Sequence, residues 1–274
     1  MKPPVGGHAP MKTDIYYFSA TGNSLWIARK IAEKIEDAEL ISIPAVIDQA
    51  PGITGEVIGI VCPIYMYNVP HIVADFIGKI AGAEYVFFVY AGAGETGNGI
   101  RAVTKLFESR ELPLQAIFNV PMPSNYTPYG CPSKEKQQKL FAEAGARIDE
   151  IAGIVRDRRS FTDSTNTSFF GAHIHPGIFY RMGYSHIPEL DKSYVTDGNC
   201  TGCGICEKVC PVGNITMKDG IPEWNHRCQL CYACLQWCPS GAIQAGDRTV
   251  GIERYHNPNV TVKDIIGASG RSVH

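Results

Sequence analysis

The chain contains the stretch Cys200-Thr-Gly-Cys203-Gly-Ile-Cys206-Glu-Lys-Val-Cys210-Pro211, and a second stretch reads Cys228-Gln-Leu-Cys231-Tyr-Ala-Cys234-Leu-Gln-Trp-Cys238-Pro239. Both stretches have the spacing C-x2-C-x2-C-x3-C-P. Three thiolates at three-residue spacing can wrap three corners of a cube of four iron and four sulfide ions. The proline after each fourth cysteine fixes a turn, so the chain leaves in a new direction there. The doubled pattern predicts two such cubes.

Zinc ions and disulfide bonds are the alternative uses of eight cysteines. Zinc sites usually show separated C-x2-C pairs instead of runs of four. A disulfide framework suits a small secreted domain, whereas this chain has 274 residues and no apolar signal core at its start. The two runs resemble those of bacterial-type ferredoxins, in which the fourth cysteine of each run ligates the other cluster. We therefore assign cluster I to Cys200, Cys203, Cys206 and Cys238, and cluster II to Cys228, Cys231, Cys234 and Cys210.

Composition narrows the class of protein. A hydrophobic fraction of 45% is ordinary for a globular chain, and no apolar run is long enough to predict a membrane span. The formal net charge is −2 with cysteine counted as neutral. Each cube bound by four thiolates carries about −2 in its oxidised form, so two cubes bring the total to roughly −6. This charge and the lack of a basic stripe argue against a nucleic-acid partner. The clusters and the two remaining cysteines, Cys62 and Cys131, favour a reducing, cytoplasmic location.

The first half of the chain alternates apolar strand patterns with helical periodicity. Strands are predicted at about 14–18, 40–43, 57–61, 85–90 and 115–120, and apolar residues at helical spacing lie between them. This alternation predicts an α/β fold with a doubly wound, five-stranded parallel sheet in the flavodoxin-like order 2-1-3-4-5. In such a sheet the ligand binds beyond the carboxyl ends of the strands, around strands 1 and 3.

The turn between the first strand and the first helix contains three hydroxyl residues and a glycine: Ser19-Ala-Thr21-Gly22-Asn23-Ser24. A helix N-terminus with free backbone N–H groups attracts anions, although Ser, Thr and Asn also serve as plain helix caps. The stretch S-x-T-G-N-S resembles the FMN-phosphate loop of flavodoxins. The resemblance implies that the hydroxyls of Ser19, Thr21 and Ser24 bind the phosphate of FMN together with the N–H groups of Gly22 and Asn23.

Two more loops follow strands at the same edge of the predicted sheet. Loop 62–70 offers flat or polarizable side chains to a planar ring, and loop 91–99 is rich in glycine, which lets backbone N–H groups approach a ring edge. Ordinary packing of the tyrosines and a simple turn at the glycines are the alternatives. Loop 91–99 has no aromatic residue, so one face of the flavin is expected to be open to a partner. The flavin-binding residues predicted in these loops are Pro63, Ile64, Tyr65, Met66, Tyr67, Ala91, Gly92, Gly94 and Gly97.

The chain is thus expected to have four segments: an FMN-binding flavodoxin-like domain (12–158), a linker or interface segment (159–192), an α+β ferredoxin domain with two [4Fe-4S] clusters (193–247) and a C-terminal tail (248–274) that packs back on a domain. The two-residue spacing of His173 and His175 favours a surface role over metal binding. This arrangement resembles flavodoxin–ferredoxin fusion proteins of anaerobic bacteria and archaea.

The resemblance implies electron transfer between the clusters and FMN, coupling a low-potential redox protein to another acceptor. The alternative is a flavin-dependent reductase of a small molecule, such as a quinone or a nitro compound, fed by the clusters. No dedicated general acid and base pair is evident in the sequence, so turnover would depend on the flavin.

Overall fold

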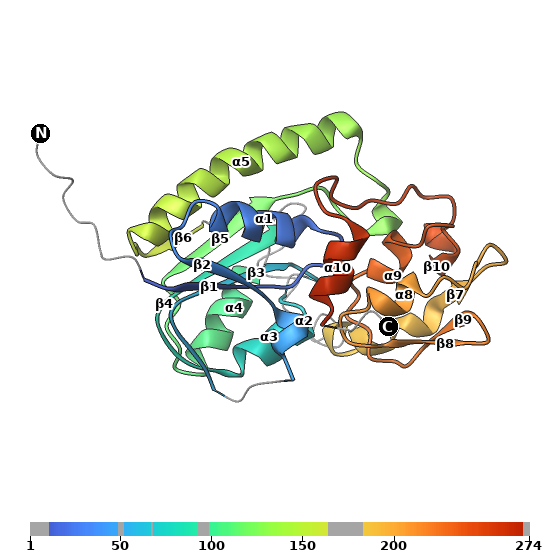
Figure 1. Cartoon of the computed structure of the whole chain (residues 1–274), viewed down its shortest axis with the longest axis horizontal. Helices are drawn as coiled ribbons and strands as arrows, with labels where there is room; N and C mark the ends of the chain where they lie inside the picture. Colours follow the sequence, from blue (N-terminus) through green and yellow to red (C-terminus); the bar gives the residue numbers. More distant parts are fainter. Residues whose placement is uncertain (1–10, 49–51, 67, 93–98, 164–182, 271–274) are drawn as a thin grey trace, which may run out of the picture.

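A computed structural model describes residues 11–48, 52–66, 68–92, 99–163 and 183–270 of the chain. Figure 1 shows a larger part built around a twisted sheet and a smaller part that contains both cysteine runs. The C-terminal helix α10 (Val262–Ala268) lies where the two parts meet. No helix in the described ranges is long and apolar enough to cross a membrane.

The larger part is organised around a fully parallel sheet with the strand order β2-β1-β3-β4-β5-β6. The predicted order 2-1-3-4-5 is confirmed, but the prediction of five strands was one too few. The sixth strand pairs Phe161 with Ala116 and Thr162 with Ile117. Two residues are too short to give a periodic signal, and they lie in the stretch expected to form the interface segment. The strands are β1 (Thr13–Tyr17), β2 (Ala38–Ser42), β3 (Ile53–Pro63), β4 (Ile80–Gly92), β5 (Ala116–Pro121) and β6 (Phe161–Thr162).

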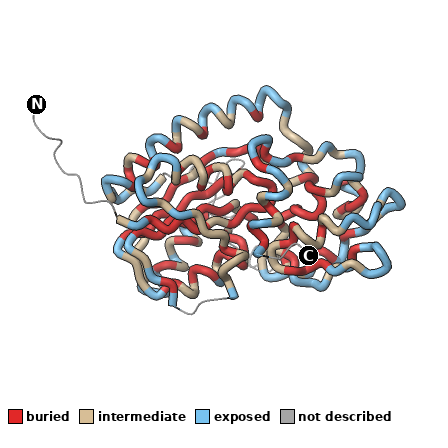
Figure 2. Tube along the Cα trace, in the orientation of Figure 1, coloured by how far each residue is buried: buried red, intermediate tan, exposed pale blue. Residues whose placement is uncertain are grey.

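Helices cover both faces of the sheet, which explains why its central strands are apolar on both sides (Figures 1 and 2). On one face, α1 (Asn23–Ala32) and α5 (Lys134–Arg156) bury residues such as Ile27 and Ile148. On the other face, α3 (His71–Ile77) and α4 (Gly99–Glu108) bury Phe76 and Phe107, and the short α2 (Ile43–Val46) adds Ile43.

One glycine in the central strand β3 is required by packing. A Cβ atom on Gly59 would lie 2.2 Å from the ring of Phe87 on the neighbouring strand. That distance is far inside van der Waals contact, so the bare backbone makes room for a fully buried ring.

The smaller part is built from two antiparallel strand pairs and two short helices. Strand β7 (Tyr194–Thr196) pairs with β10 (Ile243–Ala245), and β8 (Ile215–Lys218) pairs with β9 (Ile221–Trp224). Each cysteine run contains a one-turn helix that carries its third cysteine and ends before the fourth. These helices are α8 (Ile205–Lys208) with Cys206 and α9 (Ala233–Gln236) with Cys234. The described 3-10 helices are η1 (Thr127–Tyr129), η2 (Ile187–Ser193) and η3 (Asp247–Thr249).

The tail returns to the larger part, as the sequence predicts. A capping box between Thr261 and Asp264 starts α10. Asp264 also forms an ion pair of 2.5 Å with Arg29 on α1, and the hydroxyl of Ser42 donates a hydrogen bond to the carbonyl of Ala268. These contacts hold the tail against both α1 and β2.

Candidate functional site: a flavin-sized cavity beside the inner cysteine cluster

A cavity of about 920 Å³ lies between the carboxyl edge of the sheet and the smaller part. This volume falls within the range of pockets that hold a cofactor or small ligand. The three loops predicted for a flavin meet here, as the topology requires. The predicted residues that line the cavity are Ser19, Thr21, Asn23, Ser24, Pro63, Ile64, Tyr65, Met66 and Ala91.

The other predicted flavin residues have different positions. Gly22 lies in the same turn but is packed against the tail, and Gly92 is the last residue of β4. Tyr67, Gly94 and Gly97 lie outside the described residues, as do His173 and His175.

The turn before α1 has backbone N–H donors that are not used inside the helix. The N-cap is Gly22, with φ at +101°, and no side chain caps the helix. The first intrahelical bond runs from the N–H of Trp26 to the carbonyl of Gly22 at 2.9 Å. The N–H groups before Trp26 in the first helical turn therefore have no partner inside the helix. These donors, with the helix dipole, suit a phosphate.

Ser19 gives an independent indication of a ligand. Its Oγ is buried, and among the described residues it has no hydrogen-bond partner. A buried hydroxyl without a partner is costly, so it points to a polar group that completes the site. The geometry of the turn before α1 thus fits a phosphate group.

The side chain of Asn23 is already occupied within the protein. Its Nδ2 donates to the carbonyl of Pro123 at 3.0 Å. Its Oδ1 accepts hydrogen bonds from Tyr255 Oη at 2.7 Å and from Asn257 Nδ2 at 3.2 Å. Only the backbone N–H of Asn23 remains for a ligand, which is the group that the resemblance assigns to the phosphate.

Aromatic residues line the cavity from segments that the sequence analysis did not assign to the flavin. Tyr126 and Tyr129 come from the loop after β5, and Tyr194 and Tyr232 come from the smaller part. The expectation of an open flavin face rested on loop 91–99 alone. Since the loop after β5 opens at the same edge of the sheet, the topology could have indicated Tyr126 and Tyr129. Tyr232 lies between Cys231 and Cys234, and nothing in the spacing of the cysteine runs indicates that it would line the cavity.

Tyr65, a predicted flavin residue, is buried. Its Oη is buried with no hydrogen-bond partner in the described part of the chain. Burial raises the pKa of this hydroxyl well above its usual value, and nearby cysteine side chains, Cys231 among them, raise it further. The hydroxyl therefore stays protonated and is available as a hydrogen-bond donor in the cavity.

The eight cysteines gather in the two predicted groups of four. Cys210, Cys228, Cys231 and Cys234 line one cavity. Cys200, Cys203, Cys206 and Cys238 line another. Each group surrounds a space: across the described residues, no three His, Cys, Asp or Glu side chains come close enough to hold a single metal ion. The fourth cysteine of each run lies with the other run, which is the crossing expected for two cubes.

The two groups differ in exposure. All four thiols assigned to cluster II are buried, whereas Cys203 is exposed and Cys200 and Cys238 are partly exposed. Cys231 also belongs to the apolar core that includes Phe18 and Tyr65 of the larger part. Cluster II is thus the inner site, and cluster I is the outer one.

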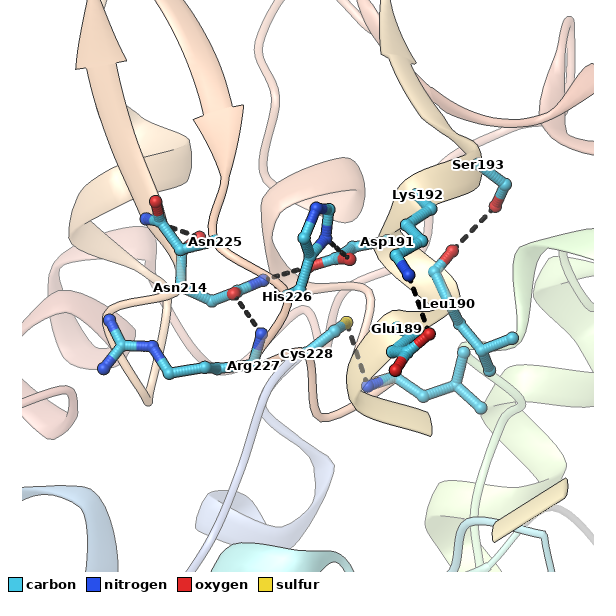
Figure 3. Close-up of polar contacts among 11 residues, drawn as sticks. Glu189, Leu190, Asp191, Lys192, Ser193, Asn214, Asn225, His226, Arg227 and Cys228 are labelled. Carbon is cyan, nitrogen blue, oxygen red and sulfur yellow. Dashed lines mark hydrogen bonds and ion pairs between the residues drawn. The ribbon is translucent and has the colours of Figure 1, made fainter. Parts of the chain in front are cut away.

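A buried polar network supports the inner group (Figure 3). The N–H of Asn214 donates to Cys210 Sγ at 3.1 Å, and its Nδ2 donates to the carboxylate of Asp191 at 2.6 Å. Its Oδ1 accepts the N–H of Arg227 at 2.5 Å. On the other side, His226 Nδ1 contacts Asp191 at 2.8 Å. Hydrogen bonds to ligand sulfurs tune the reduction potential of a cluster, and the contacts that hold the hydrogen-bonding residues in place fix the orientation of the ligands.

The wall between the large cavity and the inner group is one residue thick. Tyr194 and Tyr232 line both the large cavity and the cavity of Cys210, Cys228 and their partners. Their rings lie 6.1 Å apart with an interplanar angle of 27°. Whatever the large cavity holds is therefore close to the inner cysteines.

The two free cysteines do not take part in either group. Cys62 is fully buried, and burial raises the pKa of its thiol well above the usual value. Cys131 lies in the loop after β5, and partial burial also raises its pKa. A raised pKa disfavours the reactive thiolate, so neither thiol is activated as a nucleophile.

The cysteine region matches a known family. The family model described as "4Fe-4S dicluster domain" matches residues 199–243. A component of the ion-translocating oxidoreductase complex of Methanosarcina acetivorans is 38% identical over 61 residues, which cover 22% of this chain and 23% of that protein. A polyferredoxin-like protein of Methanocaldococcus jannaschii is 33% identical over 64 residues, covering 23% of this chain and 28% of that protein. The matched stretch spans about a quarter of the length of these curated relatives.

Solved flavoproteins resemble the larger part. The two-electron reduced flavodoxin of Megasphaera elsdenii aligns with 49% of this chain and 98% of its own, at 18% identity and a TM-score of 0.32. An FMN-dependent NADH-azoreductase from Bacillus anthracis, in complex with FMN, aligns with 53% of this chain and 99% of its own, at 12% identity and a TM-score of 0.38. The flavodoxin-like fold follows from the strand order of the sheet itself.

The chain therefore combines a flavodoxin-like α/β part with an iron–sulfur part of the ferredoxin type. Iron–sulfur clusters held by cysteine thiolates transfer electrons, so the class of protein that the matched cysteine region indicates is an electron-transfer protein.

Proposed function

We propose that this protein transfers electrons between two [4Fe-4S] clusters and FMN within one chain, and that its partners are redox proteins. The shared wall of Tyr194 and Tyr232 carries this proposal, because it brings the flavin-sized cavity next to the inner cysteines. When bound, FMN stores one or two electrons, and the clusters transfer them singly.

The residues of the chain have distinct roles in this proposal. Ser19, Thr21 and Ser24, with the free N–H groups at the start of α1, bind the phosphate. Tyr65 donates a hydrogen bond into the cavity. The buried inner thiols are kept from water, while the exposed Cys203 brings the outer cluster to the surface where a protein partner docks. Electrons would thus pass between the surface and the cavity through the outer cluster and then the inner one.

A second function is favoured by one observation. The cavity reaches the exposed residues Tyr129 and Arg248, so it has a mouth on the surface. A small planar acceptor could enter there, and the protein would then reduce it with electrons from the clusters. Steady-state turnover with quinones and nitro compounds, compared with turnover by ferredoxin-type proteins, separates the two functions.

The test of the first function uses the whole chain, purified without oxygen and loaded with iron, sulfide and FMN. The clusters are reduced rapidly with a limiting amount of reductant, and the absorbance of the flavin is followed. The expected flavin reduction is first order, with a rate that does not change with protein concentration. A rate that rises in proportion to concentration would show transfer between chains and overturn the proposal.

A further inference from the structure

The tail lies directly on the turn before α1. The N–H of Asn257 donates to the carbonyl of Thr21 at 2.8 Å. A Cβ atom on Gly22 would lie 2.8 Å from the Cβ atoms of both Asn257 and Val260. The left-handed turn at Gly22 is therefore enclosed by tail residues far away in the sequence.

Asn23 is the point at which the tail joins this turn. The hydroxyl of Tyr255 and the Nδ2 of Asn257 both donate to Asn23 Oδ1, at 2.7 and 3.2 Å. Since Asn23 is the first residue of α1, its position sets the direction of the free N–H groups that would bind a phosphate. Neither Tyr255 nor Asn257 lines the large cavity, so the tail contacts the turn outside the lining of that cavity.

The same tail segment is seated on the iron–sulfur part. The N–H of Tyr255 donates to Gln236 Oε1 at 2.7 Å. The ring of His256 stacks on Trp237 with centroids 4.2 Å apart and an interplanar angle of 14°. Gln236 and Trp237 directly precede Cys238. The tail therefore connects the segment between Cys234 and Cys238 to the predicted phosphate loop.

We infer that Tyr255 and Asn257 are positioning residues that hold the phosphate loop in its binding conformation through Asn23. This inference rests on the proposed FMN site. A loop that is ordered before binding loses less conformational entropy when the ligand arrives, so the tail raises affinity for the phosphate without touching it. Affinity for FMN then depends on the contacts of the tail with Gln236 and Trp237 in the iron–sulfur part. The sequence alone does not indicate this dependence.

The substitution Tyr255→Phe tests the inference, because it removes one hydroxyl and keeps the ring. Dissociation constants of FMN and of riboflavin are measured by flavin fluorescence on cluster-loaded protein from which the flavin has been removed. Loss of one hydrogen bond should weaken FMN binding by about three- to tenfold. Riboflavin has no phosphate, so its affinity should not change.

Tyr85→Phe is the matched control. Its hydroxyl donates one hydrogen bond as well, to the backbone carbonyl of Arg159 at 2.9 Å, and Tyr85 is buried in β4, outside the lining of the cavity. This variant should lose a comparable amount of stability while its affinity for FMN stays that of the parent. A purely structural role of Tyr255 would make the two variants behave alike.

A double-mutant cycle gives a second readout. In the Asn23→Ala background, Tyr255→Phe should have no further effect on FMN affinity, because the acceptor is already absent. If Tyr255→Phe binds FMN as the parent does, or weakens FMN and riboflavin equally, the inference is wrong. If the parent itself binds FMN and riboflavin equally, the proposed phosphate site is wrong, and the inference falls with it.

Discussion

The indole Nε1 of Trp237 donates a hydrogen bond of 2.9 Å to the backbone carbonyl of Ala20, and this bond is buried. Trp237 precedes the cluster ligand Cys238, and Ala20 lies in the turn between β1 and α1. The bond therefore ties the iron–sulfur part to the predicted phosphate loop. Unlike a linker, which would only limit their separation, such a contact fixes the orientation of the two parts.

Trp237→Phe should destabilise the protein, because it leaves the carbonyl of Ala20 without its partner. The expected loss in the free energy of unfolding is about 1–3 kcal/mol, the cost of a buried unpaired polar group. Trp224→Phe is the control, since the buried Nε1 of Trp224 has no hydrogen-bond partner among the described residues. Denaturant unfolding of the cluster-loaded chain measures both. An equal loss in the two variants would mean that the bond to Ala20 contributes nothing.

Replacing a predicted ligand should remove iron in a group-specific way. The intact chain is expected to hold about eight iron ions, as two cubes require. Cys203→Ser should lower that number by up to about four and leave the signal of the inner cluster in electron paramagnetic resonance. Cys131→Ser, which changes a cysteine outside both groups, should keep the full iron content. Stoichiometric zinc without broad visible absorbance would contradict the assignment.

Asn214→Ala should make the inner cluster labile. The substitution removes the hydrogen bonds of Asn214 to Asp191 and to the N–H of Arg227 and leaves a buried carboxylate with one contact fewer. Each lost bond to a buried group costs about 1–3 kcal/mol, so the loop that holds Cys210 should open more often. Release of iron to a chelator should be faster than in the parent. Asn199→Ala, at an exposed position near the outer group, is the control, and an equal rate in all three proteins would refute the role of Asn214.

Much of the fold could be predicted because its signals are local. Strand order follows from apolar strands that alternate with helical periodicity, and the crossing of Cys210 and Cys238 follows from the doubled spacing. The strand Phe161–Thr162 was not predicted, because it is defined by its pairing with β5 and has no apolar pattern of its own. Sequence alone located the three loops at one edge of the sheet, and the structure brings most of their predicted residues to one cavity.

The contacts across the two parts could not be predicted, because they join residues far apart in the sequence. Nothing in the sequence around Trp237 indicates its hydrogen bond to Ala20, which depends on how the parts dock. Asn23 was predicted to bind the phosphate through its backbone N–H, and nothing in S-x-T-G-N-S indicates that its side chain accepts hydrogen bonds from Tyr255 and Asn257. Such docking geometry is set by tertiary packing, for which a single sequence gives no period or spacing.

The last prediction concerns pH and the stacked ring of His256. Burial lowers the pKa of this imidazole below its usual 6.5, and Lys134 adds to the effect, while a hydrogen bond from the imidazole to the backbone of Asn257 opposes it. The unfolded chain therefore binds a proton more readily than the folded one. The free energy of unfolding therefore contains a contribution from keeping His256 neutral. This contribution is complete above pH 6.5, the pKa of the unfolded chain, and is lost as the pH falls through the lower pKa of the folded chain.

Because His256 stacks on Trp237 within the tail that holds the phosphate loop, affinity for FMN should weaken over the same acidic range. The phosphate of a monoester also loses charge near pH 6, so the parent alone cannot isolate the effect. His256→Phe keeps a stacked ring without a titrating group, and the difference between parent and variant removes the contribution of the phosphate. Affinities measured between about pH 7.5 and 5.5 should fall more steeply for the parent. Parallel curves, or a parent that binds more tightly as the pH falls, would show that protonation of His256 does not reach the phosphate loop.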